Sequence, residues 1–341
     1  MSLPGEFRAS VIASCSNPQP ENIISQYGNR IIRISDHQVV KWGPDVTKEE
    51  AENQRIAYEL VDNRIVHIPR VYAFFSDERG WGYIVMEYIE GKVIDPLEDI
   101  NAIEKVAGVV DYFATFRHDI PGPLFGGTCR GLLFPETEDL VFDSLDEMEK
   151  WFNSRLFAHN PKLNLQGCEL VLCHLDIAPR NILWQEDGSL CLIDWASAGY
   201  YPRLFEFCAQ WIIEGKDGNF NSLLLKSMNP LPYQEMAQKE SVLCAWRNIQ
   251  KYPFRTKNTN SSKTLSRDSM DRIPASPHPM PDYPPGWYEQ AQREGVTPTG
   301  PTLVAPSLSS PGTGEKNRVY NRVTRCLRAI WAPRPKPSDA A

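Results

Sequence analysis

The clearest pattern of apolar and polar positions lies in residues 169–195, ELVLCHLDIAPRNILWQEDGSLCLIDW. It contains three short apolar runs, at 170–173, 182–184 and 190–193. The dipeptide Asp187-Gly188 separates the last two runs, and such a dipeptide between apolar runs is typical of a β-hairpin turn. The pattern therefore predicts a hairpin built from the second and third runs.

Polar residues stand where these runs begin and end. His174 and Asp176 follow the first run, Asn181 precedes the second, and Asp194 ends the third. The hairpin turn brings Asn181 and Asp194 back to the same edge, while Asp176 lies on the loop that feeds the first strand. Two carboxylates and an amide oxygen are hard ligands that suit Mg²⁺ together with a phosphate and water.

Residues 20–42 are predicted to form strands around a turn at Tyr27-Gly28-Asn29. After this turn, apolar residues at 31, 32 and 34 and at 39, 40 and 42 lie on either side of Asp36-His37. A glycine turn of this kind can fold over phosphates, so we assign Gly28 and Asn29 to a phosphate cover. Lys41 follows two β-branched residues, and on a strand its ammonium can point into a cleft as a point charge for phosphate.

A helix is predicted from about Thr47 to Leu60, TKEEAENQRIAYEL. Thr47 can cap it, and Glu50 three residues later completes a capping box. Glu50 has a second reading, as the partner of an ion pair that orients Lys41. The sequence pattern leaves both readings open.

Further elements follow along the chain. A long strand is expected over residues 81–91 and a core-facing helix over 101–117, where apolar residues recur at helical spacing. Ser144 can cap a helix through about Phe157, and residues 198–202 are expected to turn the chain into a helix that starts near Arg203. Residues 221–249 look helical, with breaks at two prolines.

The composition changes beyond Lys251, where half of the chain's 28 prolines lie among Ser, Thr, Asn and Gly. Such a segment cannot bury enough apolar surface to offset its ordering entropy, so we expect residues 255–317 to be disordered. Residues 318–331 form a basic amphipathic pattern, which indicates a helix that docks on a partner or is incidental.

Charge and cysteine content narrow the function classes. Residues 255–341 contain 13 Lys and Arg against 7 Asp and Glu, so within a net charge of −7 residues 1–254 carry −13. An acidic body disfavours nucleic acid as a partner and suits a neutral or cationic small molecule. No apolar run is long enough for a membrane span, no secretory signal is recognised, and the 8 cysteines show no zinc spacing. We expect a cytoplasmic protein with reduced thiols.

The spacing H-x-D-x-x-x-x-N over 174–181, followed by the I-D-W that contains Asp194, is that of a kinase catalytic loop and its metal-binding aspartate. Together with the I-P-x-V segment at 68–71, it resembles the aminoglycoside phosphotransferase (APH) family of kinase-like enzymes, in particular its fungal-type members of unassigned substrate. The resemblance implies an α+β, bilobal protein-kinase-like fold: a small N-terminal antiparallel β-sheet lobe and a larger, mainly helical C-terminal lobe. We place an extension at 1–20, the lobes at 21–90 and 91–254, and a tail at 255–341.

The resemblance also implies site roles. Asp176 accepts or orients the proton of a substrate hydroxyl, and Asn181 and Asp194 hold Mg²⁺ between the phosphates of ATP. Lys41 contacts those phosphates. The glutamate that orients Lys41 aligns with Glu50, and Glu52 is the alternative if the helical phase is shifted. The expected adenine-binding hinge consists of Glu87, Tyr88 and Ile89, through their main-chain groups.

Two residues of the catalytic loop keep open readings. His174 belongs to the catalytic set, where bracing the loop by hydrogen bonds is favoured over acid–base work. Arg180 either assists phosphate binding or has a solvent or structural role. Leu175 replaces the glycine of the family's common H-G-D.

The acceptor is expected to be the hydroxyl of a small molecule rather than a protein. Asp194 is followed within about ten residues by a predicted helix, and the A-P-E that ends the long activation segment of protein kinases is absent. Residues expected near the substrate are Tyr200, Tyr201, Arg203 and Glu206. The alternative is a catalytically silent kinase-like binding or regulatory protein, because the region after the hairpin is short.

Overall fold

The structure is a computed structural model, and it describes residues 5–25, 30–214, 216–252 and 254. The predicted disorder of 255–317 and the predicted basic helix at 318–331 lie outside the described residues. Every element below belongs to one compact unit of the chain.

A five-stranded antiparallel sheet forms the small lobe, with the strand order β1-β2-β3-β5-β4. Its strands are β1 (Ile23–Ser25), β2 (Arg30–Ser35), β3 (Gln38–Gly43), β4 (Val71–Ser76) and β5 (Gly82–Glu87). The central strand β3 pairs on both sides, so that Lys41 lies opposite Ile31 on β2 and Ile84 on β5. The strand that we predicted over residues 81–91 is shorter in the structure, where β5 ends at Glu87 and the following residues lie outside the sheet.

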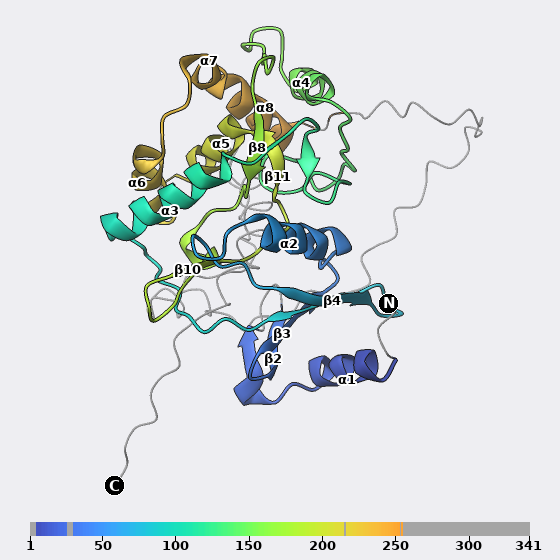
Figure 1. The fold of residues 1–341 in the computed structure, drawn as a ribbon. Helices are drawn as coiled ribbons and strands as arrows, with labels where there is room; N and C mark the ends of the chain where they lie inside the picture. Colours follow the sequence, from blue (N-terminus) through green and yellow to red (C-terminus); the bar gives the residue numbers. More distant parts are fainter. Residues whose placement is uncertain (1–4, 26–29, 215, 253, 255–341) are drawn as a thin grey trace, which may run out of the picture. The chain divides into compact units, whose positions relative to one another are not determined.

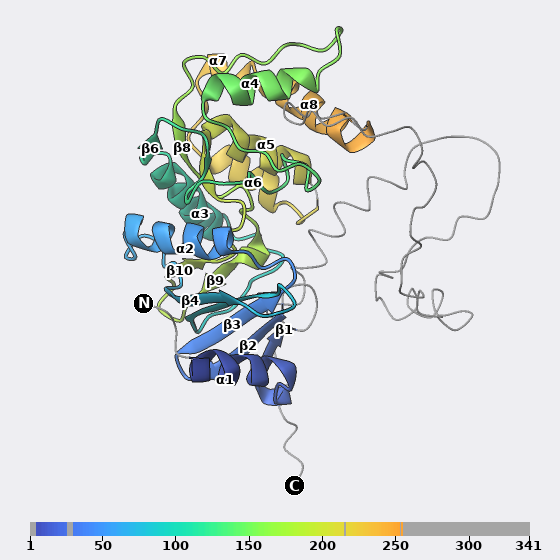
Figure 2. The ribbon, with the colours of Figure 1, turned by 90° about the vertical axis from the view of Figure 1, so that its right-hand side faces the viewer.

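One helix covers each face of this sheet, as Figures 1 and 2 show for α1 (Gly5–Ser16) and α2 (Lys48–Leu60). Because side chains alternate along a strand, Val40 and Trp42 of β3 face α1, where they pack with Val11. Val39 packs on the opposite face with Ala51 of α2. The segment that we interpreted as an N-terminal extension thus contributes a helix to the core of the small lobe.

The large lobe is mainly helical, and its core holds fully buried aromatic side chains such as Phe113, Trp195 and Phe205. Its helices are α3 (Ile100–Phe113), α4 (Leu145–Ser154), α5 (Arg203–Ile213), α6 (Phe220–Ser227), α7 (Tyr233–Met236) and α8 (Lys239–Lys251). Side chains cap two of them as helix propensities require: Asp99 accepts from Asn101 N at 3.0 Å and Ser144 from Glu147 N at 3.2 Å.

A small second sheet completes the large lobe, in the order β6-β8-β11-β7. Its strands are β6 (Arg117–His118), β7 (Gly122–Pro123), β8 (Leu170–Cys173) and β11 (Gly199–Pro202). We predicted that residues 198–202 form a turn, and this was wrong. They form a strand because β8 and β7 supply antiparallel partners on both sides, which no local pattern reveals.

The predicted hairpin is confirmed as β9 (Ile182–Trp184) and β10 (Leu190–Leu192), with Leu192 opposite Ile182. Segments from elsewhere in the chain extend it on both sides. His67, before β4, donates to Leu190 O at 2.8 Å and accepts from Leu192 N at 2.9 Å. Lys92, after β5, exchanges two main-chain hydrogen bonds with Trp184. The hairpin is thereby held in register with the end of the small lobe.

Two negative findings concern the described part of the chain. None of its helices is long and apolar enough to span a membrane. Its cysteines are all free thiols, and most of them are buried.

The packing of α1 generates a stability prediction. Val11 is buried against the sheet, whereas its neighbour Ser10 is exposed. Val11→Ala removes roughly two methyl groups from this contact and should lower the free energy of unfolding by about 1.5 kcal/mol. Urea denaturation measures the change, with Ser10→Ala as the matched control in the same helix. Equal stability of the two variants would contradict a core role for α1.

Candidate active site

Asp176, Asn181 and Asp194 lie together where the hairpin meets the loop before it. Asn181, at the end of the 3₁₀ turn Pro179–Asn181, donates through Nδ2 to Asp176 O at 2.9 Å and Asp176 Oδ2 at 2.8 Å. Ile193 N donates to Asn181 O at 3.0 Å, which extends the hairpin ladder by one pair and brings Asp194 next to it. The three polar residues that the sequence singled out are thus brought to one place.

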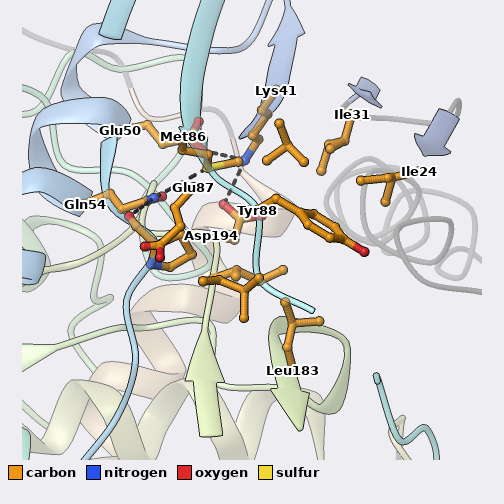
Figure 3. Close-up of a pocket in the computed structure, with 14 residues that line it drawn as sticks. Ile24, Ile31, Lys41, Glu50, Gln54, Met86, Glu87, Tyr88, Leu183 and Asp194 are labelled. Atoms are coloured by element: carbon orange, nitrogen blue, oxygen red, sulfur yellow. Dashed lines mark hydrogen bonds and ion pairs between the residues drawn. The ribbon is translucent and has the colours of Figure 1, made fainter. Parts of the chain in front are cut away.

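Lys41 lies between two carboxylates (Figure 3). Its Nζ forms an ion pair with Glu50 Oε1 and lies 3.3 Å from Asp194 Oδ1. The lysine comes from β3, the glutamate from α2 and the aspartate from the residue after Ile193. Lys41 and Glu50 are almost completely buried, so the interaction joins both lobes away from bulk water.

The structure separates the two readings of Glu50. Thr47 caps α2 by accepting a hydrogen bond from Glu50 N at 3.2 Å, but the Glu50 side chain turns to Lys41 and does not return to the cap. Glu52, the alternative partner, pairs with Arg55 on the same helix. Glu50 is therefore both a main-chain donor to the cap and the partner of Lys41.

The charges around Lys41 fix its protonation. Burial alone would lower the pKa of Lys41, but the carboxylates of Asp194 and Glu50 raise it above its ordinary value. Burial opposes ionisation of Asp194, yet the Lys41 ammonium holds the pKa of this carboxyl below its ordinary value. Both groups are charged at neutral pH, as phosphate and metal binding require.

A pocket opens beside this ion pair. The predicted hinge residues Glu87, Tyr88 and Ile89 line it, together with Lys41 and Asp194. Glu87 N and Tyr88 N already donate to Arg70 O and His37 O, both at 2.9 Å. Among the hydrogen bonds between described residues, none uses the Ile89 amide.

Aliphatic side chains form the walls of the pocket, and sequence analysis did not assign them. They are Ile24, Ile31, Val39, Leu183 and Ile193 (Figure 3 shows their side chains). Strand alternation could have identified two of them: Val39 lies two residues before Lys41, and Ile31 lies opposite Lys41 in the register. The others become neighbours only through the approach of the hairpin.

Gly28 and Asn29, the predicted phosphate cover, lie outside the described residues. The strands on either side of them are described. β1 ends at Ser25 and β2 begins at Arg30.

Asp176 is held by more than its asparagine neighbour. Arg180 Nη2 lies 2.5 Å from Asp176 Oδ1, and Arg180 Nη1 lies 3.5 Å from Asp217 Oδ2. Burial raises the pKa of Asp176 to about 6, although Arg180 opposes the increase. The carboxyl is thus mainly ionised at neutral pH and can accept a proton. Asp217 was not identified from the sequence, since nothing local marks it.

His174 braces the loop through hydrogen bonds of its main chain. Its main-chain amide donates to Glu206 Oε2 at 2.7 Å, and its carbonyl accepts from Ser197 Oγ at 3.2 Å. The ring itself is fully buried and lies edge-on to Trp195, with centroids 4.9 Å apart. Burial lowers the pKa of His174 to about 4, so the ring is neutral at physiological pH. The main-chain groups of His174 therefore hold the loop.

Leu175 explains why glycine is common at its position in the motif. Its φ is +61°, in the left-handed region that is unfavourable for residues with a Cβ. Glu206 Oε2 accepts from Leu175 N at 3.0 Å as well as from His174 N. One buried carboxylate oxygen therefore holds two successive amides of the strained turn that precedes Asp176.

The other residues expected near the substrate have different neighbours. Tyr201 is fully buried against Phe134 and Phe205. Tyr200 stacks on His118, and Arg203 pairs with Asp111 on α3. Tyr201 and Glu206 are buried, so the prediction that they contact a substrate was wrong. A substrate contact for Tyr200 and Arg203 stays a prediction.

Asn181 and Asp194 fit a magnesium ion. Asn181 Nδ2 donates to two oxygens of Asp176 that can only accept, so the orientation of the amide is determined. The other amide atom, Oδ1, is buried and has no hydrogen-bond partner among the described residues. An orphaned carbonyl-type oxygen next to a carboxylate suits a hard cation that keeps other ligands from water and phosphate. In the described part of the chain no group of three or more His, Cys, Asp and Glu residues is placed to hold a metal ion.

The chain is similar to known proteins. A model of the phosphotransferase enzyme family (APH) matches residues 21–221, which include every site residue from Lys41 to Asp217. Among solved structures, the chain is similar to a thermostable mutant of aminoglycoside phosphotransferase APH(4)-Ia, at 14% identity and a TM-score of 0.45, over 70% of this chain and 88% of that one. It is also similar to choline kinase LicA from Streptococcus pneumoniae, at 16% identity and a TM-score of 0.40, over 73% and 94%. A search of curated proteins found no match.

The positive φ of Leu175 predicts that glycine is more stabilising than alanine at this position, the reverse of the usual order. Leu175→Gly and Leu175→Ala both remove a buried side chain, but only glycine relieves the positive φ. The glycine variant should therefore be the more stable of the two by about 1 kcal/mol in urea denaturation. The same pair of substitutions at Leu172, a buried β8 residue, should show the opposite order. A less stable glycine variant at both positions would contradict the strain.

Glu206 generates a pH prediction. Burial raises the pKa of Glu206 from 4.5 to about 7, although the two amides oppose the increase. Burial therefore penalises ionisation of Glu206 in the folded state but not in the unfolded state. The free energy of unfolding of the wild type, compared with that of Glu206→Gln, should fall as pH rises from about 4.5 to about 7. Above about pH 7 the difference between the two proteins should stay constant. The difference between these pKa values corresponds to about 3 kcal/mol.

Urea denaturation of both proteins between pH 5 and pH 8 measures this change. Glu186→Gln, at an exposed position of the hairpin turn, is the control and should follow the wild type at every pH. Parallel curves for the wild type and Glu206→Gln would contradict the raised pKa.

Proposed function

The chain belongs to the phosphotransferase enzyme family, and from this premise we propose that it transfers the γ-phosphoryl group of ATP, bound with Mg²⁺, to a hydroxyl group of a small molecule. The observation that carries the proposal is the position of Lys41. Its buried ammonium joins Glu50 to Asp194 at the edge of the hinge-lined pocket.

Nucleotide binding is supported by the pocket's two kinds of surface. Aliphatic walls from both lobes, including Val39 and Leu183, suit the faces of a flat base. The Ile89 amide can donate to a ring nitrogen at the edge of the base. Lys41, at the other end of the pocket, offers a positive charge to the phosphates.

Asn181 and Asp194 would hold Mg²⁺, which neutralises the charge that develops on the phosphates during transfer. The charge balance supports a cation here. The ammonium of Lys41 and the guanidinium of Arg180 face four carboxylates, those of Glu50, Asp194, Asp176 and Asp217. Two negative charges are left over when all six groups are ionised.

Asp176 is the proposed base. Its side chain is 20% exposed, so a hydroxyl can reach a carboxylate that is otherwise fixed by two neighbours. Accepting the hydroxyl proton and orienting the oxygen are the roles that a kinase assigns to this position. His174 is not part of this proton transfer, because its ring is buried and neutral.

A small acceptor is favoured by the short connection after Asp194. Residues 195–202 separate it from α5, and they include strand β11. A protein acceptor would need a longer segment on which to dock, as the activation segment provides in protein kinases.

The proposal predicts that Asp176→Asn lowers phosphoryl transfer by about 10²–10⁴-fold and leaves Mg-ATP binding intact. Transfer is measured with Mg-ATP and a panel of amino alcohols and sugars. Binding is measured by thermal shift, since nucleotide at ~100 times its dissociation constant adds about 2.7 kcal/mol of stability. Asp187→Asn, in the exposed hairpin turn, is the matched control and should keep wild-type activity.

Unchanged transfer by Asp176→Asn would refute the role of the base. If Mg-ATP stabilises the wild type but no acceptor, water included, receives a phosphoryl group, the protein is a silent nucleotide-binding relative. No stabilisation by Mg-ATP or Mg-GTP would refute nucleotide binding altogether.

A further inference from the structure

Arg180 is buried between two carboxylates rather than directed at the nucleotide pocket. Its side chain is 10% exposed, with Nη2 at 2.5 Å from Asp176 Oδ1 and Nη1 at 3.5 Å from Asp217 Oδ2. Of the two readings that the sequence left open, phosphate binding is therefore the less compatible with this geometry.

The contact with Arg180 completes the fixation of Asp176. Asn181 Nδ2 holds Oδ2 of that carboxylate at 2.8 Å, so each oxygen has its own donor. The 3₁₀ turn Pro179–Asn181 turns the chain back, so that Arg180, four residues after Asp176, lies next to the Asp176 carboxylate. With both oxygens held, the plane of the carboxylate is determined before a substrate arrives.

Asp217 determines in turn where the guanidinium lies. It stands in the connection between α5 and α6, next to Gly218, whose φ is +62°. A Cβ at Gly218 would lie 3.8 Å from both Pro96 and Glu98, which follow the hinge in sequence. The turn that carries Asp217 therefore lies next to the segment that follows the hinge, and it places Asp217 Oδ2 3.5 Å from Arg180 Nη1.

An arginine suits this position better than a lysine. The planar guanidinium presents donors in different directions and can bridge two carboxylates, whereas an ammonium is a compact point charge on a flexible stem. Two partly buried carboxylates around one cation also make its removal costly, because their charges would be left uncompensated.

We propose that Arg180 is a positioning residue for phosphoryl transfer, which holds the Asp176 carboxylate in its reactive orientation while Asp217 holds the guanidinium. This inference rests on the proposed function, and it assigns Asp217 to the same unit. It explains why a cationic residue lies next to Asn181 without reaching the nucleotide pocket.

The test compares Arg180→Ala with the wild type in phosphate release from Mg-ATP, with water as the acceptor. Loss of orientation should lower kcat by about 10²-fold and leave the KM for Mg-ATP unchanged. Millimolar guanidinium should restore part of the lost kcat by filling the vacated position, and urea, which has a similar shape without the charge, should not. Arg180→Lys should recover less than half of the loss.

Arg155→Gln is the matched control, because Arg155 forms a comparable buried ion pair with Glu138 at 2.7 Å on a different part of the large lobe. It should lower Tm, and guanidinium should not change its kcat. Asp217→Asn should also lower kcat, and the Arg180→Ala/Asp217→Asn double variant should be no slower than Arg180→Ala alone.

A wild-type kcat in Arg180→Ala would overturn the inference, and so would a loss that guanidinium does not restore, since this is the behaviour of a merely structural pair. Additive losses in the double variant would remove Asp217 from the unit. These results differ from failure of the proposed function, in which the wild type itself releases no phosphate and phosphorylates no acceptor.

Discussion

The buried ammonium of Lys41 is the interaction on which the arrangement of the site depends. A buried ammonium without a partner would destabilise the fold by several kcal/mol. Carboxylates from other elements must therefore lie next to Lys41. Glu50 comes from α2 and Asp194 from the end of the hairpin. Because both carboxylates pair with Lys41, the interaction fixes the sheet, the helix and the hairpin relative to one another, and it holds the ammonium at the edge of the pocket.

Helix α2 extends this connection through a buried polar face. One turn after Glu50, Asn53 donates to Trp195 O at 3.2 Å and Ala198 O at 3.1 Å, and Gln54 donates to Pro69 O at 2.6 Å. Polar side chains are buried there because each has a main-chain partner in another segment. The helix therefore joins β3, the segment after Asp194 and the approach to β4, and a displacement of α2 would change all three contacts together.

Local rules were sufficient for much of this structure. The Asp187-Gly188 turn predicted the hairpin, Thr47 and Ser144 marked the starts of helices, and the spacing from His174 to Asp194 predicted the cluster around Asp176. What could not be predicted depends on contacts between distant segments. The core role of α1, the pairing of β11, and the contacts of Glu206 and Asp217 all require neighbours that are distant along the chain. Leu175 was recognised as a departure from glycine, but only its φ shows the physical reason.

The most direct measurement follows the terminal phosphate of γ-labelled ATP in the full-length chain, with Mg²⁺ or with EDTA, in the presence of small hydroxyl compounds. The site described here predicts that label appears on one class of small acceptor, or on water, only with Mg²⁺, and that Asp194→Asn abolishes the transfer. Label that remains on ATP under every condition, or that moves equally well in the Asp194→Asn variant, would contradict a phosphotransferase built around Lys41, Asp176, Asn181 and Asp194.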